Sequence, residues 1–334
     1  MSWRTETRPA PFLLRPAGKD YLWGGTRLRE DFGKDLPMEP LAETWECSTH
    51  PDGPSHVCGG EFDGQPLAEV LKMHPEFLGS HPRTKGELPI LIKLIDAKQD
   101  LSVQVHPGDE FAAREEHGQL GKTEMWYVLD TAKDAHLVYG LHRDTDAATL
   151  RRALAEGSIM KYLQKVPVRR DDVFYIEAGT IHALGAGTLV AEIQQNSNLT
   201  YRLYDYDRTD KAGNKRPLHI DKALAAADLR GKAAPVQPMR VRRYRPGCAA
   251  ELLCRCRYFE VNRLQVNTER IRAMVPYRAD GFSFRVLLCV AGCGMMKQES
   301  GEVLPLFRGD CVFFPADSQP VRLHGRAQFL DVRC

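Results

Sequence analysis

The sequence predicts a mainly β fold, an antiparallel sandwich or barrel, and a jelly roll is our choice among these. Two observations carry this prediction. Short runs rich in Val, Ile, Tyr and Phe are bounded by Gly, Pro or Asp, which is typical of strands. Most of these runs follow one another at close intervals without regular helices between them, which favours antiparallel pairing. In the first part of the chain the predicted strands are 87–97, 101–106, 124–130, 136–141, 172–178, 188–195 and 200–207.

Helical segments interrupt the strands at a few places. Apolar residues in these segments recur every three or four positions, as they do on one face of a helix. The two main segments are 66–79 and 144–165, and shorter helices are expected at 109–118 and 219–229. Asp144 and Thr145 are suited to cap the start of the longest segment.

The length of 334 residues favours two domains, because a single core of this size is unusual. The stretch GKAAPVQP follows the last predicted helix and has the composition of a linker. We therefore expect a first domain with helical insertions at residues 1–234 and a second β domain at residues 235–334. The second domain is expected to stabilise the first by covering its sheet.

A short internal similarity connects the two predicted domains. Residues 171–182, DDVFYIEAGTIH, align without gaps to residues 310–321, DCVFFPADSQPV. His182 then lies opposite Val321, so a duplicated unit has kept this histidine only in its first copy. The second domain is therefore predicted to be a related, degenerate β domain without metal ligands.

Composition and charge argue against several classes of protein. The 46 basic and 44 acidic residues give a net charge of +2, and no long basic run supports a nucleic-acid surface. No apolar stretch approaches a membrane span, and the first residues lack the apolar core of a signal peptide. The nine cysteines are odd in number and irregular in spacing, which favours reduced thiols in the cytoplasm.

Three strand segments carry isolated polar residues in an otherwise apolar context. In LSVQVH, Ser102, Gln104 and His106 alternate with apolar residues and so share one face of a strand. Glu124 and His182 stand in two further segments. Two neutral imidazoles and a carboxylate form a reasonable Zn²⁺ set, and the strands of a barrel bring distant residues together. A hydrogen-bonded structural role is the alternative for each histidine.

These segments belong to a longer series of motifs that resembles type I phosphomannose isomerase in its shorter bacterial form. The resemblance runs in order and with compatible spacing from about residue 11 to about residue 230. The last hundred residues match only loosely, as a degenerate cupin-like domain. The motifs are DYLWGGTRL, LAETWECSTHPDG, IKLIDAKQDLSVQVHPGDEFA, GKTEMWYVLD, AGTIHALGAGTLVAEIQQNSNLTYRLYDYDR and LHIDKAL.

The resemblance implies a cupin-type jelly-roll barrel with one zinc ion per chain. It also implies interconversion of mannose 6-phosphate and fructose 6-phosphate by proton transfer through a cis-enediol. Such an enzyme connects fructose 6-phosphate to mannose metabolism and GDP-mannose biosynthesis. We expect it in the cytoplasm as a monomer or weak homodimer, with a phosphorylated hexose as its partner and neither nucleic acid nor membrane.

Matched position by position, the family's zinc ligands fall on His106, Glu124 and His182. Gln104 takes the place of a residue that is a fourth ligand in longer members of the family. Whether Gln104 coordinates the metal directly is left open by the resemblance.

The remaining functional positions of the family also have counterparts in this sequence. The essential arginine falls on Arg202, and a carboxylate proposed as the proton carrier falls on Glu192. Ser102 and Lys122 fall on positions assigned to phosphate or substrate contact. Lys122 lies two residues before Glu124, so in a strand it shares that face, which suits phosphate contact. Lys122 is also counted with the catalytic residues.

Lys93 is a further candidate for phosphate contact. It stands between aliphatic residues in LIKLID, and lysine is rarely buried without a partner or a function. The alternative for both Lys93 and Lys122 is an ion pair with a structural carboxylate such as Asp96.

Two rival functions use the same residues. Two histidines and one carboxylate also form the metal-binding triad of non-haem Fe(II) oxygenases. The basic residues around the ligands argue against this rival, since they suit a phosphorylated substrate. A non-catalytic, metal-bearing sensor of sugar phosphates is the second rival, and the presence of Arg202 and Glu192 disfavours it.

Overall fold

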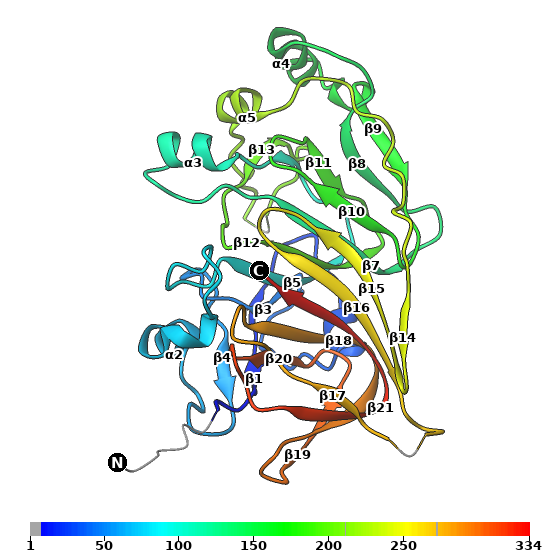
Figure 1. The fold of residues 1–334 in the computed structure, drawn as a ribbon. Helices are drawn as coiled ribbons and strands as arrows, with labels where there is room; N and C mark the ends of the chain where they lie inside the picture. Colours follow the sequence, from blue (N-terminus) through cyan, green and yellow to red (C-terminus); the bar gives the residue numbers. More distant parts are fainter. Residues whose placement is uncertain (1–7, 211, 272) are drawn as a thin grey trace.

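The protein is described by a computed structural model covering residues 8–210, 212–271 and 273–334. The strands of these described residues form three antiparallel sheets, called sheets I, II and III below, which lie one above another in Figure 1. This architecture agrees with the predicted mainly β fold.

Sheet I lies between the other two and has six strands. Their order is β10 (Val173–Ile176), β7 (Glu124–Thr131), β12 (Thr188–Gln195), β5 (Ile90–Ala97), β3 (Glu43–Cys47) and β2 (Ala17–Lys19). Sheet II has five strands in the order β13 (Tyr201–Tyr204), β6 (Val103–Val105), β11 (His182–Leu184), β8 (His136–Leu141) and β9 (Leu163–Pro167). Sheets I and II together form the first barrel.

Sheet III contains most of the C-terminal part of the chain and forms the second barrel. Its main path is β14 (Arg243–Arg245), β15 (Cys248–Arg255), β16 (Glu260–Asn267), β21 (Val321–Arg333), β18 (Arg285–Lys297), β20 (Cys311–Phe314), β1 (Phe12–Arg15) and β4 (His56–Cys58). Two further strands, β17 (Val275–Tyr277) and β19 (Val303–Phe307), pair with β21 and β18.

The helices are short and lie outside the sheets. They are α1 (Arg27–Glu30), α2 (Leu67–Met73), α3 (Asp109–Glu115), α4 (Ala147–Ala155) and α5 (Ile220–Ala226), with 3₁₀ turns at Pro75–Leu78 and Ile159–Lys161. Figure 1 shows α4 and α5 beside sheet II, at the end of the molecule far from sheet III.

Sheet I is buried on both faces because its strands carry apolar residues at nearly every position. On the face toward sheet II, Trp126 and Val190 belong to the core of the first barrel. On the other face, Leu94 and Ile193 share a core with Phe313 of sheet III. The apolar side of sheet III therefore covers the outside of the first barrel, as layered β architectures require.

The predicted helix at 144–165 is too long. Helix α4 ends at Ala155, and Gly157 follows with φ of +66°, a left-handed conformation that glycine adopts without strain. The chain then makes a short 3₁₀ turn and continues as strand β9. The helix start is capped by Asp146, which accepts a hydrogen bond from the Thr149 amide, and not by the two residues before it.

The alternation predicted around β6 fails at its first residue. Val103 and Val105 pack on the outside of sheet II with residues of α4 and α5. Leu101, which strict alternation places on the same face, lies inside the first barrel near Trp126. Leu101 precedes the strand, so the period-2 rule does not apply to it.

Two N-terminal strands are hydrogen-bonded into the second barrel. Phe12 of β1 pairs with Phe313 of β20, and Leu13 of β1 pairs with Cys58 of β4. The division into residues 1–234 and 235–334 stays a prediction. The structure adds that β1 and β4, from the first part, belong to the second barrel.

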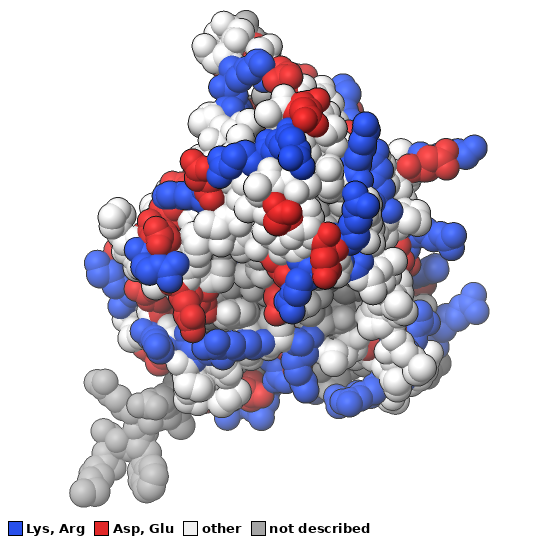
Figure 2. Space-filling model, turned by 90° about the horizontal axis from the view of Figure 1, so that it is seen from above, with Lys and Arg blue, Asp and Glu red and all other residues white. Residues whose placement is uncertain are grey.

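The charged surface is mixed. Figure 2 shows basic and acidic side chains interspersed over the face seen from above, as the near balance of the two types leads one to expect. In the described part of the chain, no helix is both long and apolar enough to cross a membrane.

The first prediction concerns the ion pair that holds α1 against sheet I. The buried carboxylate of Asp96 accepts hydrogen bonds from the Arg27 amide at 2.9 Å and from its Nε at 2.7 Å. Replacing Asp96 by Ala leaves the guanidinium without this partner, so the free energy of unfolding should fall by about 2–3 kcal/mol. Urea unfolding followed by circular dichroism measures the change.

Asp130→Ala is the matched control, because the half-exposed Asp130 lies 3.6 Å from the same guanidinium. An exposed pair of this kind contributes less than about 1 kcal/mol. Equal losses in the two variants would contradict a structural role specific to Asp96.

Candidate metal centre

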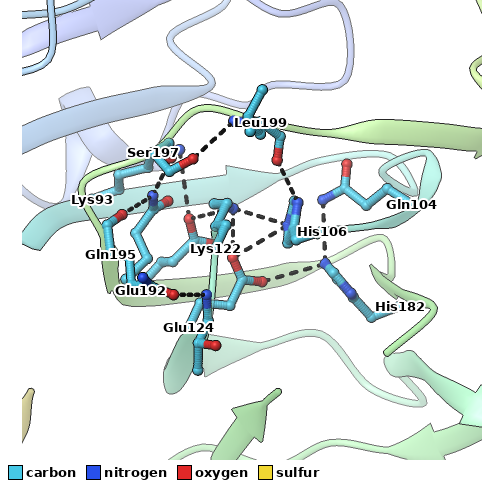
Figure 3. A network of polar contacts seen from close by, with 12 residues as sticks. Lys93, Gln104, His106, Lys122, Glu124, His182, Glu192, Gln195, Ser197 and Leu199 are labelled. Atoms are coloured by element: carbon cyan, nitrogen blue, oxygen red, sulfur yellow. Dashed lines mark hydrogen bonds and ion pairs between the residues drawn. The ribbon is translucent and has the colours of Figure 1, made fainter. Parts of the chain in front are cut away.

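Three strands bring His106, Glu124 and His182 together at one end of the first barrel (Figure 3). His182 is the first residue of β11 in sheet II, and His106 follows the end of the neighbouring β6. Glu124 is the first residue of β7 in sheet I. The possible ligand atoms of the three residues all lie within 4.8 Å of one another, and all three side chains are buried.

Backbone carbonyl groups fix the orientation of both imidazoles. His106 Nδ1 lies 2.8 Å from the Leu199 oxygen, and His182 Nδ1 lies 2.8 Å from the Thr180 oxygen. A carbonyl oxygen only accepts, so each Nδ1 carries the proton and each Nε2 keeps its lone pair. The Nε2 atoms lie 3.4 Å and 3.3 Å from the two Glu124 oxygens. A hydrogen bond from the second ring nitrogen to a backbone carbonyl is typical of histidine metal ligands.

The protonation states also suit a divalent cation. Burial and the nearby Lys122 lower the pKa of His106 to about 3, and burial lowers the pKa of His182, so both rings are neutral at pH 7. Burial alone raises the pKa of Glu124, but Lys122 and the two histidines hold it well below its usual range. Glu124 Oε1 is buried and accepts no hydrogen bond from a described residue. Two neutral imidazoles and an ionised, partly unsatisfied carboxylate fit Zn²⁺.

Lys122 places its ammonium group inside this cluster. Its Nζ donates to Glu124 Oε2 at 2.5 Å and to His106 Nε2 at 3.0 Å, and it lies 3.5 Å from Glu192 Oε1. Lys122 precedes β7, which begins at Glu124, so the two residues do not share a strand face, but their side chains are in direct contact. The ammonium group connects the candidate ligands to Glu192.

Gln104 lies at the edge of the cluster. Its strand position pairs with His182 on one side and with Arg202 on the other. Its amide nitrogen is 3.5 Å from His182 Nε2. Direct coordination by Gln104 stays a prediction.

A second row of buried polar side chains crosses sheet I beside the cluster. Trp45, Lys93, Glu192 and Trp126 are directly opposite one another on β3, β5, β12 and β7. Lys93 Nζ lies 3.5 Å from Glu192 Oε1 and 3.5 Å from an oxygen of Glu43. Burial lowers the pKa of Lys93, but the two carboxylates outweigh this effect and raise it above its ordinary value.

Glu192 is held by contacts to both of its oxygens. The indole Nε1 of Trp126 donates to Oε2 at 2.8 Å, while Oε1 faces Lys93 and Lys122. Burial and the nearby Glu124 raise the pKa of Glu192 above its usual value. A carboxylate with a raised pKa and one oxygen near a cation is suited to accept and return a proton.

Glu43 is the residue of this row that sequence analysis missed. It pairs with Lys93 and accepts a hydrogen bond from Trp45 Nε1 at 2.8 Å. Its position two residues before Trp45 places it on the same strand face, and this was the available signal. Asp96 is not the partner of Lys93, because it faces Arg27 instead.

Arg202 stands at the more exposed border of the site. Its Nε donates to the Ser102 hydroxyl at 3.3 Å, and its Nη1 donates to the Pro217 carbonyl at 2.9 Å. The side chain is only partly buried, whereas Ser102 is buried. This pair places a permanent positive charge and a hydroxyl on the border of the polar row.

Comparison with known proteins supports one family. A family model described as phosphomannose isomerase type I, catalytic domain, matches residues 12–134. Mannose-6-phosphate isomerase ManA of Bacillus subtilis is 36% identical over 321 residues, which are 95% of this chain and 97% of that protein. Mannose-6-phosphate isomerase of Streptococcus mutans is 42% identical over 228 residues, 68% of this chain and 71% of that protein.

A solved structure agrees with these matches. The crystal structure of mannose 6-phosphate isomerase from Bacillus subtilis superposes with a TM-score of 0.85 at 34% identity, covering 97% of this chain and 99% of that one. The chain therefore belongs to the type I phosphomannose isomerase family of aldose–ketose isomerases, and its mainly β, cupin-type fold is the fold of that family.

Proposed function

We propose that this protein is a zinc-dependent mannose-6-phosphate isomerase whose partner is a phosphorylated hexose. The observation that carries the proposal is the buried His106–Glu124–His182 cluster, which stands next to the proton-accepting carboxylate of Glu192. Family membership supplies the substrate class. Cytoplasmic location and a monomeric or weakly dimeric state remain predictions.

His106, Glu124 and His182 would hold the metal, with Gln104 near enough to assist. When bound, Zn²⁺ supplies Lewis-acid stabilisation of the negative charge that develops on the substrate oxygens. The Nδ1–H groups of both histidines donate to backbone carbonyls, and this orientation directs the Nε2 lone pairs at the centre of the cluster.

Glu192 is our candidate for the group that moves the proton. In the forward direction its carboxylate accepts the proton from C2 of the open-chain aldose, which leaves a cis-enediolate. Transfer of the O2 hydroxyl proton to O1, by way of the cis-enediol, and return of the first proton to C1 then complete the ketose. The Trp126 indole fixes Oε2 of Glu192, so the other oxygen is directed toward the site. A positioned base of this kind contributes roughly 10²–10⁴-fold to the rate.

The cations and the hydroxyl group complete the site. Lys122 lies between Glu124 and Glu192 and keeps positive charge close to both carboxylates. Arg202 and Ser102 are proposed to contact the substrate from the border, where a fixed guanidinium also assists opening of the sugar ring. Lys93 is proposed to support Glu192 and to add a cation for substrate contact.

The oxygenase alternative uses the same ligand types. Three positively charged groups around the cluster, Lys93, Lys122 and Arg202, suit a phosphorylated sugar better than an uncharged oxygenase substrate. Family membership points in the same direction, so no second function is proposed.

The proposal is tested by removal of the metal and of one ligand. Purified protein should convert mannose 6-phosphate to fructose 6-phosphate in a coupled assay, lose this activity after chelation, and regain it with Zn²⁺. His182→Ala should lose bound zinc, measured by mass spectrometry, together with activity, because a three-residue site without one ligand binds metal poorly. Turnover that survives complete metal removal would exclude a metal-dependent mechanism, and no turnover by metallated, folded protein would defeat the isomerase proposal.

Arg202→Ala separates the border of the site from the metal cluster. The variant should keep its zinc content, because the arginine contacts Ser102 and Pro217 and none of the three candidate ligands. Its kcat/KM should fall by roughly 10²–10³-fold, the usual effect of removing a group that stabilises developing charge. Loss of zinc from this variant would contradict the division of roles.

Glu192→Gln tests the proton carrier. The amide cannot accept the C2 proton, so exchange of substrate hydrogen with deuterated water, followed by NMR, should slow by roughly 10²–10⁴-fold. Zinc content should be unchanged.

Glu43→Gln is the matched control, since Glu43 is equally far from Lys93 but lies on its other side. It should retain most of the exchange activity. An equal loss in both variants would assign the effect to the charge of Lys93 rather than to proton transfer.

A further inference from the structure

The two barrels match strand for strand in their hydrogen bonding. In the first, β10, β7, β12 and β5 are successive neighbours, and in the second β20, β18, β21 and β16 follow in the same way. Trp126 of β7 pairs with both Phe174 and Glu192, and Leu287 of β18 pairs with both Val312 and Asp331. These pairings define equivalent positions without reference to sequence similarity.

Within these strands, the positions made equivalent by hydrogen bonding differ by one residue from the ungapped alignment of residues 171–182 with 310–321. Phe174 faces the interior of the first barrel, whereas Phe313, its partner in the ungapped alignment, faces the core between sheets I and III. Val312 faces the interior of the second barrel and is the true equivalent of Phe174. The next loop restores the alignment, since His182 and Val321 each begin the following strand.

The polar positions of the catalytic barrel have charged counterparts in the second one. Glu124 pairs with the last residue of β10, and Arg285 pairs with the last residue of β20, so Arg285 takes the place of Glu124. Asp331 takes the place of Glu192. An arginine thus replaces the acidic ligand, and a carboxylate remains at the position of the proton carrier.

These replacements form a compact cluster. Arg285 Nη1 donates to Asp331 Oδ2 at 2.7 Å, and the Tyr277 hydroxyl donates to Asp331 Oδ1 at 2.8 Å. The cluster lines a cavity of about 1430 Å³. The second barrel is therefore open next to the position that corresponds to the active site of the first.

The lining of this cavity carries an excess of positive charge. Its described residues include six arginines but three carboxylates, of which Asp331 pairs with Arg285 and Glu260 pairs with two arginines. Arg243, Arg245 and Arg278 line the exposed border, and no described carboxylate forms an ion pair with any of them. Unpaired guanidinium groups gathered around one cavity are suited to bidentate contact with phosphate oxygens.

We propose that the open end of the second barrel is an additional binding site for a small phosphate-bearing metabolite. The excess of arginine selects the phosphate, and the apolar residues of the same lining, such as Met239 and Leu252, accept the rest of the molecule. Most pockets for small molecules measure about 300–1,000 Å³, so this one accommodates ligands larger than a hexose phosphate. The site is separate from the metal cluster and does not depend on the proposed isomerase activity.

Isothermal titration calorimetry with inorganic pyrophosphate tests the site in the full-length protein. The double variant Arg245→Gln/Arg278→Gln should weaken binding at least about tenfold, since two charge-assisted contacts are lost. These arginines are exposed, so the variant should fold; Arg285 is avoided because its loss would leave Asp331 buried without a partner. Isomerase turnover should be unchanged.

Two controls locate the bound anion. Arg322→Gln removes the same charge from the outer face of β21 and should leave pyrophosphate binding unchanged. Arg202→Gln removes an arginine of the first barrel and should also leave this binding intact. The proposal is overturned if pyrophosphate does not bind, if the double variant binds it normally, or if the Arg202 variant alone abolishes binding.

A second titration identifies the source of the phosphate. Mannose 6-phosphate binding at two molecules per chain, reduced to one in the double variant, would assign the site to the enzyme's own type of substrate. One molecule per chain in both proteins, with pyrophosphate binding still sensitive to the double variant, would assign it to larger diphosphates.

Discussion

The first barrel depends on how a buried, ionised carboxylate is compensated. Glu124 is wholly buried at the start of β7, and an unpaired charge in such a place would cost several kcal/mol. The surrounding structure meets this cost with Lys122, two residues before the strand, and with the two imidazoles of His106 and His182. Because one Glu124 oxygen accepts no hydrogen bond from the part of the chain that the structure describes, the compensation is incomplete without a further cation. The same constraint explains why a backbone carbonyl accepts a hydrogen bond from Nδ1 of each imidazole. These hydrogen bonds orient the rings so that the Nε2 lone pairs point toward the Glu124 carboxylate.

The polar row beside this cluster requires that sheet I be sealed on its other face. Lys93 and Glu192 are buried at directly opposite positions, and their attraction is strong only where water is excluded. The second barrel provides this exclusion, because its apolar face packs on the outside of the same strands. Lys34 adds a polar contact between the two halves, donating to Glu46 of β3 and to the Gly309 carbonyl, each at 2.6 Å. We infer that the C-terminal part of the chain contributes to the electrostatics of the first barrel without contacting its ligands.

Local sequence patterns were sufficient for part of the fold and of the site. Alternation grouped Gln104 with His106, and both side chains lie beside His182. A spacing of two residues grouped Lys122 with Glu124, and these two side chains are in contact. Contacts between distant segments were beyond such patterns. The pairing of Lys93 with Glu43 depends on the register between β3 and β5, which no local rule fixes. The predicted end of α4 was wrong for a related reason. Apolar residues beyond Gly157, such as Leu163, belong to strand β9, whose partner β8 lies elsewhere in the chain.

Equivalent positions in the two barrels carry side chains of opposite charge, Glu124 in the first and Arg285 in the second, and each charge is compensated in a different way. The first side chain of β7, and likewise of β18, points into its barrel, where an uncompensated charge is unfavourable. In the first barrel this side chain is an acid, and neutrality there calls for a cation that the described side chains only partly supply. In the second it is Arg285, whose charge is balanced within the chain by Asp331. With an acid at this position the site attracts a metal ion, whereas with arginine the ion pair with Asp331 makes the site neutral. The remaining excess of arginine lies farther out, at the cavity border, where its field acts on anions in solvent rather than on the barrel interior.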